Sequence, residues 1–304
     1  MYTKPTRAFT LLLILGFIWG TGYSIARFAT THGVPPLGYS FWQALGPALF
    51  LCFLTKSPLF SYKISIAKLK YYLILGLTGI VIPNTNMYFA AAHLPAGILA
   101  VIVNTVPIFA YILAIIARIE TFNPTRFLGI LTAILGLMFI LFPSASLPSE
   151  KMVPWVLSAL ITPLSFAFFA VFISRFGPKE EDSQTLARGM LISASVLLAP
   201  LVLFTQNFYM FHFPLQIQDG IILLEIILSS IGYILFFQLI KTAGPVYYSL
   251  VDTIVALTGL FWGYVIFHEK LNVWTTPAVI LILFALILVT KEQRHLLTAR
   301  ETTC

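Results

Sequence analysis

Residues 8–28 read AFTLLLILGFIWGTGYSIARF, an apolar run that ends beside a single basic residue. A helix rises about 1.5 Å per residue, so a run of about 20 residues crosses the roughly 30 Å hydrocarbon core of a bilayer. Lys4 and Arg7 precede the run, but it is too long for the core of a signal peptide and has no evident small-residue cleavage site. We therefore predict a first transmembrane helix that is retained in the protein.

The same pattern recurs along the whole chain of 304 residues. Hydrophobic residues make up 59% of the sequence and charged residues 10%, whereas about 25% of residues are charged in an average soluble domain. A soluble fold could not bury this much apolar surface, so we predict an all-α integral membrane protein. Its ten transmembrane helices are expected at residues 8–28, 36–55, 70–92, 95–117, 125–142, 152–174, 185–204, 219–239, 244–267 and 272–290.

The basic residues fall on alternate gaps between these spans. Arg27, Lys151 and Lys270 are the exceptions, and every other Lys and Arg lies on the side of the N-terminus. Cytoplasmic loops of membrane proteins carry an excess of Lys and Arg, and a span count changed by one would destroy this division. We therefore expect a multi-pass protein of the cell inner (plasma) membrane with both termini in the cytoplasm. The net charge of +7 follows from this topology and indicates no nucleic-acid partner.

The two halves of the chain resemble each other. A shift of 148 or 149 residues superimposes segments of the first half on similar segments of the second: 25–28 (IARF) on 173–176 (ISRF), 103–105 (VNT) on 251–253 (VDT), and Glu120 on Glu269. Each copy would contain five spans, an odd number, so the second copy must cross the membrane in the opposite direction. We predict two inverted five-helix repeats, at residues 1–145 and 146–304, as is typical of secondary transporters.

The first span also resembles a known family. Its motif Gly16-Phe17-Ile18-Trp19-Gly20-Thr21, with Arg27 eight positions after the Trp, resembles the opening helix of the EamA branch of the drug/metabolite transporter (DMT) superfamily. The resemblance continues where Glu120 and Glu269 precede helices patterned Gly129…Gly136 and Ala278…Ala285. The chain departs from the family pattern early in the second span, where Trp42 and Gln43 stand in place of a common Arg.

This resemblance implies an architecture and an activity. It implies ten helices in two inverted repeats around a central cavity lined by spans 1, 3, 4, 6, 8 and 9. It also implies export of small organic solutes, with amino acids or related amphipathic metabolites as the first expectation.

Asp252 is the residue in the sequence that most strongly suggests a site. If the ninth helix starts near Gly244, Asp252 lies about 12 Å inside the hydrocarbon core. An ionised carboxylate is costly there unless it is paired or faces a water-filled cavity. Asp252 is therefore a candidate proton-coupling group or an anchor for a cationic solute, and the alternative is a polar helix–helix contact through Ser249 or Thr253. Its repeat partner, Asn104, is a second candidate for solute binding.

Three further polar residues lie within predicted spans. Glu225 falls about six residues into the eighth span, so it is either a second proton-coupling or solute-binding candidate or a side chain near the outer headgroups, and we favour the headgroup position. Asn84 and Asn86 follow Pro83 in the third span. They could bind a solute or satisfy the backbone carbonyl that the proline leaves free.

Aromatic and charged residues complete the set of candidates. An aromatic cavity wall that stacks rings or holds a cation would come from Trp19, Tyr23, Tyr88, Tyr111, Tyr233 and Trp262. In a chain with 15% aromatic residues, many of these could equally pack in the core or face lipid. We assign gating or structural roles to the charged residues at span ends: Arg27, Glu120, Arg175 and Glu269.

The sequence lacks the motifs of other functional classes. It has no HExxH, no cysteine cluster and no phosphate-binding glycine loop, so we expect no metal, no cofactor and no ATP hydrolysis. We predict a secondary transporter that exports small metabolites by alternating access and works as a monomer or homodimer. Proton antiport is the hypothesis for its coupling. The alternatives are a multidrug or organic-cation exporter of the same fold and, in a different class, an intramembrane enzyme.

Overall fold

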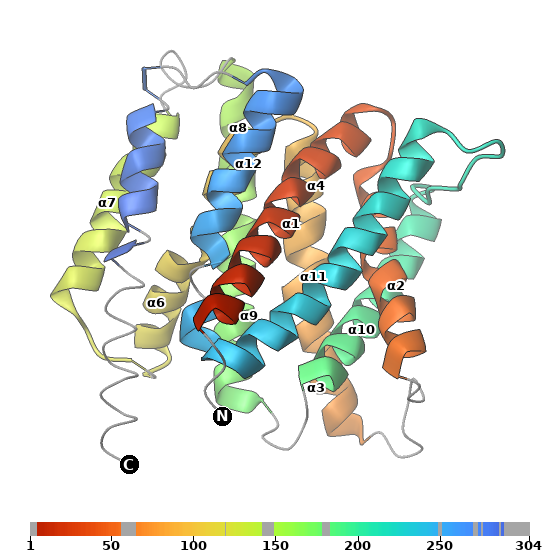
Figure 1. Cartoon of the computed structure of the whole chain (residues 1–304), viewed down its shortest axis with the longest axis horizontal. Coiled ribbons are helices and arrows are strands. Elements are labelled where there is room, and N and C mark those ends of the chain that lie inside the picture. The colour runs from red at the N-terminus through yellow and green to blue at the C-terminus, as the bar shows by residue number, and fades with distance from the viewer. Residues whose placement is uncertain are drawn as a thin grey trace.

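The computed structural model describes residues 5–55, 65–118, 120–141, 149–177, 183–248, 251–269, 273–274, 276–285 and 287–288. The described chain is a bundle of helices (Figure 1). They are α1 (Pro5–Thr31), α2 (Pro36–Thr55), α3 (Ile66–Gly76), the π-helical turn η1 (Leu77–Val81), α4 (Ile82–Ala91), α5 (Ala96–Val103), α6 (Val106–Ile116), α7 (Pro124–Leu141), the 3₁₀ turn η2 (Glu150–Met152), α8 (Val153–Ala159), α9 (Ile161–Phe176), α10 (Ser183–Phe204), α11 (Ile217–Tyr248) and α12 (Val251–Phe267). A further apolar helix covers Thr276–Ala285.

These helices account for the ten predicted spans. Seven stretches of the described chain are helical, long and apolar enough to cross a bilayer, and α3–η1–α4, α5–α6 and α8–α9 each act as one of them. Three shorter apolar helices, at Pro124–Phe139, Val251–Phe267 and Thr276–Ala285, supply the fifth, ninth and tenth spans. The protein is an all-α integral membrane protein with ten transmembrane helices, as predicted.

The fourth span is broken in its middle, between α5 and α6. The helix stops at Asn104 and Thr105, and Pro107, which has no N–H to donate, lies in the first turn of α6. Side chains bind the carbonyls near the break: Asn104 Nδ2 donates to Ala100 O at 2.7 Å and Thr105 Oγ1 to Ile102 O at 2.7 Å. A break at this depth is tolerated because the protein itself satisfies the backbone groups that lipid cannot.

The boundary between the eighth and ninth spans differs from the prediction. The sequence predicts spans at 219–239 and 244–267, but helical backbone continues in α11 through Tyr248. Residues 249–250 lie outside the described part of the chain, and α12 is described from Val251, with Asp252 as its second residue. The repeat partner of Asp252, Asn104, lies at the break between α5 and α6.

The packing of the helices follows the two inverted repeats. Helix α1 of the first repeat lies against α11 and α12 of the second. Its counterpart α9, of the second repeat, lies against α4 and α6 of the first. Likewise α2 packs on α11, and its counterpart α10 packs on α3. Two further pairs join the repeats, α2 with its counterpart α10 and α5 with α12. The contacts of α1 and α2 with the second repeat therefore recur as contacts of α9 and α10 with the first.

The described basic side chains gather at one end of the bundle. We call the end at which α1 begins the basic end; it is the lower end in Figure 1. Seven described Lys and Arg residues lie there: Arg7, Lys68, Lys70, Arg118, Arg126, Arg175 and Arg188. Arg27 and Lys151 lie at the opposite end. The side chains of the remaining Lys and Arg, including Lys4, Lys241 and Lys270, fall outside the described part of the chain.

Glycines allow α1 and α12 to approach closely. A Cβ at Gly16 would lie 2.5 Å from Ile254 Cγ2, and one at Gly20 would lie 2.7 Å from the backbone oxygen of Val255. Small residues four apart let transmembrane backbones come together, which strengthens van der Waals contact where no hydrophobic effect drives helices together. These two glycines hold the first repeat against the second.

The segment that connects α10 to α11, residues 205–216, packs on α2 at the end of the bundle opposite the basic end. Trp42 Nε1 donates to Tyr209 O at 2.9 Å, and the Tyr209 hydroxyl donates to Asp219 Oδ1 at 2.7 Å. Burial and the neighbouring Asp219 carboxylate raise the pKa of the Tyr209 hydroxyl, which therefore stays protonated as a donor. The backbone N–H of Gln216 also binds Asp219, at 2.7 Å, so one carboxylate anchors both sides of the segment to the start of α11.

A side chain at Gly20 should weaken the bundle. We expect Gly20→Ala to lower the free energy of unfolding by about 1–3 kcal/mol, because the added methyl group meets Val255 and Thr258. The measurement is thermal unfolding of the purified protein in detergent, followed by tryptophan fluorescence. Gly220→Ala is the matched control, since nothing lies within 4 Å of a Cβ at Gly220. Equal melting temperatures for the two variants would contradict this packing.

Candidate functional site

A buried acid lies between helices of both repeats. Glu225 is 7% exposed and lies about 12 Å along α11 from Ile217. This burial shows that the side chain packs among helices, and its position relative to the outer headgroups stays a prediction. Oε1 accepts a hydrogen bond from Ser229 Oγ at 2.7 Å, whereas Oε2 is buried with no hydrogen-bond partner among the described residues.

Two tyrosines stand beside this carboxylate. The rings of Tyr39 on α2 and Tyr88 on α4 meet edge to face with centroids 4.6 Å apart, and both are almost fully buried. The Tyr39 hydroxyl lies near Glu225 and, like Oε2, has no hydrogen-bond partner in the described structure. The hydroxyl is close enough to interact with the carboxylate, and a small movement of either side chain would let Tyr39 donate to Glu225.

A chain of amides continues from Ser229 into the first repeat. Gln43 Nε2 donates to Ser229 Oγ at 3.4 Å, and Asn84 Nδ2 donates to Gln43 Oε1 at 2.9 Å. The predicted residue Asn84 is therefore connected through Gln43 to Glu225. We call Tyr39, Gln43, Asn84, Tyr88, Glu225 and Ser229 the Glu225 cluster; its members come from α2, α4 and α11.

Asp252 also lies near α1. Tyr23, on α1, is close to Asp252, and its hydroxyl accepts a hydrogen bond from Asn104 Nδ2 at 3.2 Å. The structure thus brings three predicted residues together, one each from spans 1, 4 and 9. Asp252 is half-buried, and no described residue forms a hydrogen bond or ion pair with it. Tyr23 also lies near Tyr88 of the Glu225 cluster.

An aromatic contact joins α1 to α11. The indole of Trp19 packs against Tyr233 with centroids 6.4 Å apart and against Phe236 at 5.7 Å. The absence of a side chain at Gly232 makes room for the indole, since a Cβ there would overlap Trp19. Tyr233 in turn lies near Gln43 and Glu225, so the predicted aromatic residues Trp19, Tyr88 and Tyr233 border the Glu225 cluster.

Three predicted residues lie apart from both acids. Asn86 donates to Ser158 Oγ at 2.9 Å and accepts from Thr162 Oγ1 at 3.1 Å, so it joins α4 to α8 and α9. The Tyr111 hydroxyl accepts from the Asn123 backbone N–H at 2.6 Å at the basic end. Trp262 packs against Phe17 with centroids 5.6 Å apart, and Phe17 is exposed on the outside of the bundle.

The charged residues at the opposite end form a contact between the repeats. Glu269 pairs with Arg27 at the end of α1. The same carboxylate accepts from the backbone N–H groups of Ala96 at 2.7 Å and Gly97 at 3.0 Å, so it also caps the N-terminus of α5. We call this contact between Arg27, Glu269 and the start of α5 the latch.

The equivalent residues at the basic end are not paired with each other. Glu120 pairs with Arg126 of its own repeat, and Arg126 stacks over Tyr111 with its guanidinium carbon 4.9 Å from the ring centroid. Arg175 instead donates to the backbone oxygen of Ala117 at 2.9 Å. The two ends of the bundle therefore differ although the repeats share these residues.

Sequence reasoning missed three members of the Glu225 cluster. Tyr39, Gln43 and Ser229 were not among the candidates, although a Gln inside an apolar span is a visible polar signal. Tyr39 and Ser229 carried no such signal, because tyrosines and serines are common in transmembrane helices.

The chain matches proteins of one family over most of its length. Residues 6–142 and residues 153–291 each match the EamA-like transporter family. Protein PecM of Dickeya dadantii is 24% identical over 278 residues, which are 90% of this chain and 88% of PecM. An uncharacterized transporter of Archaeoglobus fulgidus is 19% identical over 279 residues, 90% of this chain and 95% of that protein.

A solved crystal structure has the same fold. It aligns with 96% of this chain and 99% of its own, with a TM-score of 0.61 at 15% sequence identity. The two successive family matches agree with the duplication inferred from the shift of 148 residues, and the predicted resemblance is confirmed. This protein belongs to the EamA-like transporter family.

Proposed function

We propose that this transporter exports small amphipathic organic solutes, amino acids or related metabolites first, across the inner membrane by alternating access. The observation that carries the proposal is the pair of acids, Glu225 and Asp252, inside the bundle near Gly22 and Tyr23 of α1. Neither forms an ion pair with a described residue. Ionisable groups within transmembrane bundles typically mark substrate or ion pathways.

The Glu225 cluster has the chemistry to hold an amino group. An ammonium group offers donors to the free Oε2, and its oxygen-bearing neighbours could bind the Tyr39 hydroxyl. Tyr88, Tyr233 and Trp19 supply an apolar and aromatic wall for the rest of the solute. An ammonium group would add a positive charge beside the Glu225 carboxylate, which favours cationic solutes over purely apolar ones.

The unequal ends support alternating access. The latch closes the opposite end by joining α1 to α5, and the equivalent pair at the basic end, Glu120 and Arg175, is separated. In the transport cycle the latch opens, and Arg175 leaves Ala117 to pair with Glu120. Inverted repeats make this exchange natural, because each repeat can adopt the arrangement of the other.

Proton coupling is assigned to Asp252. Its polar neighbours are Tyr23 and Asn104 rather than a fixed cation, so the carboxylate can gain and lose a proton without breaking an ion pair. Glu225 is the second coupling candidate. A proton taken up at either acid would compete with a cationic solute for the same charge, which is the simplest form of antiport.

Export of organic cations is the second candidate function. It is favoured by the aromatic side chains around Glu225, since a cation over Tyr or Trp rings is stabilised by their quadrupoles. The two candidates differ in whether the solute also needs a carboxylate. The amides of Gln43 and Asn84 would receive that carboxylate in an amino-acid exporter and would be dispensable in a cation exporter.

The orientation follows from the charges. The basic end faces the cytoplasm in the positive-inside arrangement, which places both termini there and the latch on the outer side. The repeat boundary at residues 145 and 146 and a monomeric or homodimeric state complete the proposal.

Loss of the Asp252 charge should uncouple transport. A solute is first identified by a thermal-shift screen of the purified protein against amino acids, quaternary amines and nucleosides. In proteoliposomes that contain a pH-sensitive dye, we expect solute movement by the wild type to move protons. Asp252→Asn should retain solute exchange and lose proton movement, because no titratable group remains at this position. Glu181→Gln, in the polar segment between the sixth and seventh spans, is the control, and proton flux retained by Asp252→Asn would contradict the assignment.

Glu225→Gln should weaken binding of amine solutes. A hydrogen bond to a charged group contributes about 1.5–3 kcal/mol, so we expect affinity to fall about tenfold to a hundredfold, measured by titration calorimetry. Asn86→Ala removes an interior amide that contacts Ser158 and Thr162 instead, and it should leave affinity unchanged. Equal affinities of wild type and Glu225→Gln would contradict a role in binding.

The same titration separates the two candidate functions. An amino acid is compared with the amine that remains after its carboxylate is removed. Tighter binding of the amino acid supports the metabolite exporter, and equal or tighter binding of the amine supports the cation exporter.

A further inference from the structure

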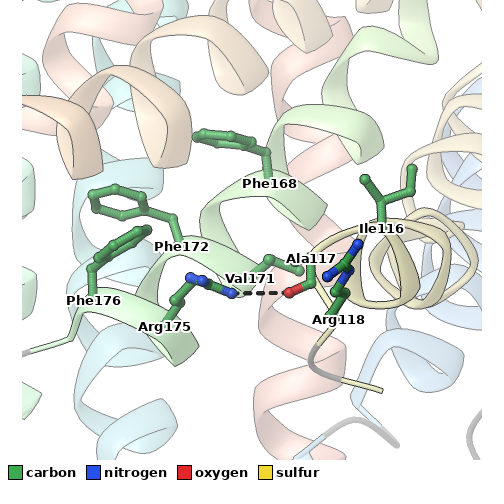
Figure 2. Close-up of a pocket in the computed structure, with 8 residues that line it drawn as sticks. All are labelled: Ile116, Ala117, Arg118, Phe168, Val171, Phe172, Arg175 and Phe176. Atoms are coloured by element: carbon green, nitrogen blue, oxygen red, sulfur yellow. Dashed lines mark hydrogen bonds between the residues drawn. The ribbon is translucent and has the colours of Figure 1, made fainter. Parts of the chain in front are cut away.

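A groove opens between α6 and α9 at the basic end of the bundle. It encloses about 440 Å³, and Figure 2 shows the side chains around it. Eight residues line it: Ile116, Ala117, Arg118, Phe168, Val171, Phe172, Arg175 and Phe176. None of them belongs to the Glu225 cluster or to the group around Asp252, so the groove is a separate feature. We call it the α6–α9 groove.

The contact of α9 with α6 differs from that of α1 with α12 in its side chains. Under the shift of 148 residues, Gly16 and Gly20 of α1 correspond to Leu164 and Phe168 of α9. The two glycines let α1 and α12 touch, as the short contacts to Ile254 and Val255 indicate. Helix α9 also packs against α6, and Phe168 is one of the residues that line the groove beside that contact.

The walls of the groove are apolar and open to the outside of the bundle. Ile116 is 71% exposed, Phe168 46% and Phe176 59%. On a soluble protein such exposure would be costly, but in a membrane-spanning segment these side chains face hydrocarbon chains. The groove is therefore open toward lipid.

The rim of the groove carries two cations from different repeats. Arg118 follows α6, where the chain turns with a positive φ of 55°. Arg175 lies in the last turn of α9 and donates one N–H to Ala117 O at 2.9 Å, which leaves its other donors free to bind a ligand. Figure 2 shows the two guanidinium groups on either side of the Ala117 carbonyl. Neither arginine has an acidic partner in the described part of the chain.

We propose that the α6–α9 groove is a binding site for an anionic phospholipid. The phosphate group binds Arg118 and Arg175 at the rim, and an acyl chain lies along Phe168, Phe172 and Ile116. Basic pockets between transmembrane helices on the cytoplasmic side have the right charge and depth for anionic headgroups. This is the side on which the proposed orientation places the basic end.

Because of where the groove lies, bound lipid affects transport. Its two arginines belong to different repeats, so one bound phosphate joins the repeats at the basic end. A phosphate on Arg175 also competes with Glu120 for the same guanidinium. Bound lipid therefore stabilises the arrangement seen here, in which the latch is closed and Glu120 and Arg175 are apart.

Lipid binding is tested by native mass spectrometry of the full-length protein, titrated with dioleoylphosphatidylglycerol or dioleoylphosphatidylethanolamine. We expect the wild type to retain one phosphatidylglycerol more tightly than phosphatidylethanolamine. Replacing both arginines, Arg118→Gln with Arg175→Gln, should lower phosphatidylglycerol affinity about thirtyfold, because each basic residue near the membrane surface contributes about 1 kcal/mol. Lys68→Gln with Lys70→Gln is the matched control at the same end, outside the groove, and should leave affinity unchanged.

A second variant tests the acyl-chain wall with both charges intact. Val171→Trp fills the groove and should also weaken phosphatidylglycerol binding. Equal binding of the two lipids by the wild type would overturn the proposal without reference to any variant. Equal losses in the arginine and lysine pairs would overturn it too, since they would show only general surface charge.

Discussion

Lipid offers no hydrogen bonds, and this constraint governs every polar group inside the bundle. Where the fourth span breaks, Asn104 and Thr105 turn their side chains onto the carbonyls of Ala100 and Ile102. Where an acid reaches the end of α12, Arg27 and two backbone amides receive it. Against this pattern, Glu225 and Asp252 are acids inside the bundle with no ion-pair partner among the described residues. Groups left without partners in such a medium are where a solute or a proton is expected to bind.

The same constraint applies to the acids at the two ends of the bundle, Glu269 and Glu120, which have different partners. Glu269 takes its partners from across the repeat boundary, whereas Glu120 takes Arg126 from its own repeat. Under the shift that aligns the two acids, Arg126 corresponds to Thr275, so the second repeat lacks this alternative cation. In the proposed cycle Glu120 exchanges Arg126 for Arg175, and one ion pair replaces another at the basic end. A lipid phosphate at Arg175 would bias that exchange.

Much of the fold could be predicted because it depends on local sequence. The length of each apolar run, the alternation of basic gaps and the repeated IARF and ISRF segments predict ten helices in two inverted copies. The candidate site was harder, because its contacts join distant segments. The depth of Glu225 depends on where α11 begins and which face it turns inward, and Gln43 acquires its role only through Asn84 and Ser229. The extent of α11 was missed because Gly244 and Pro245 signal a turn that the helical backbone through Tyr248 does not make. The α6–α9 groove could not be predicted, because its lining comes from segments far apart in the sequence.

The central claim is that the two ends of the bundle open and close in opposition, controlled by the latch. It is tested most directly by distances between spin labels in lipid nanodiscs, with one pair at Thr31 and His93 and another at Thr121 and Phe176. The first pair reports on α1 and α5 at the latch, and the second on α6 and α9 at the basic end. Glu269→Gln, which breaks the latch, should lengthen the first distance and shorten the second. If both distances lengthen, or if only the first changes, the two ends are not coupled and the account is contradicted.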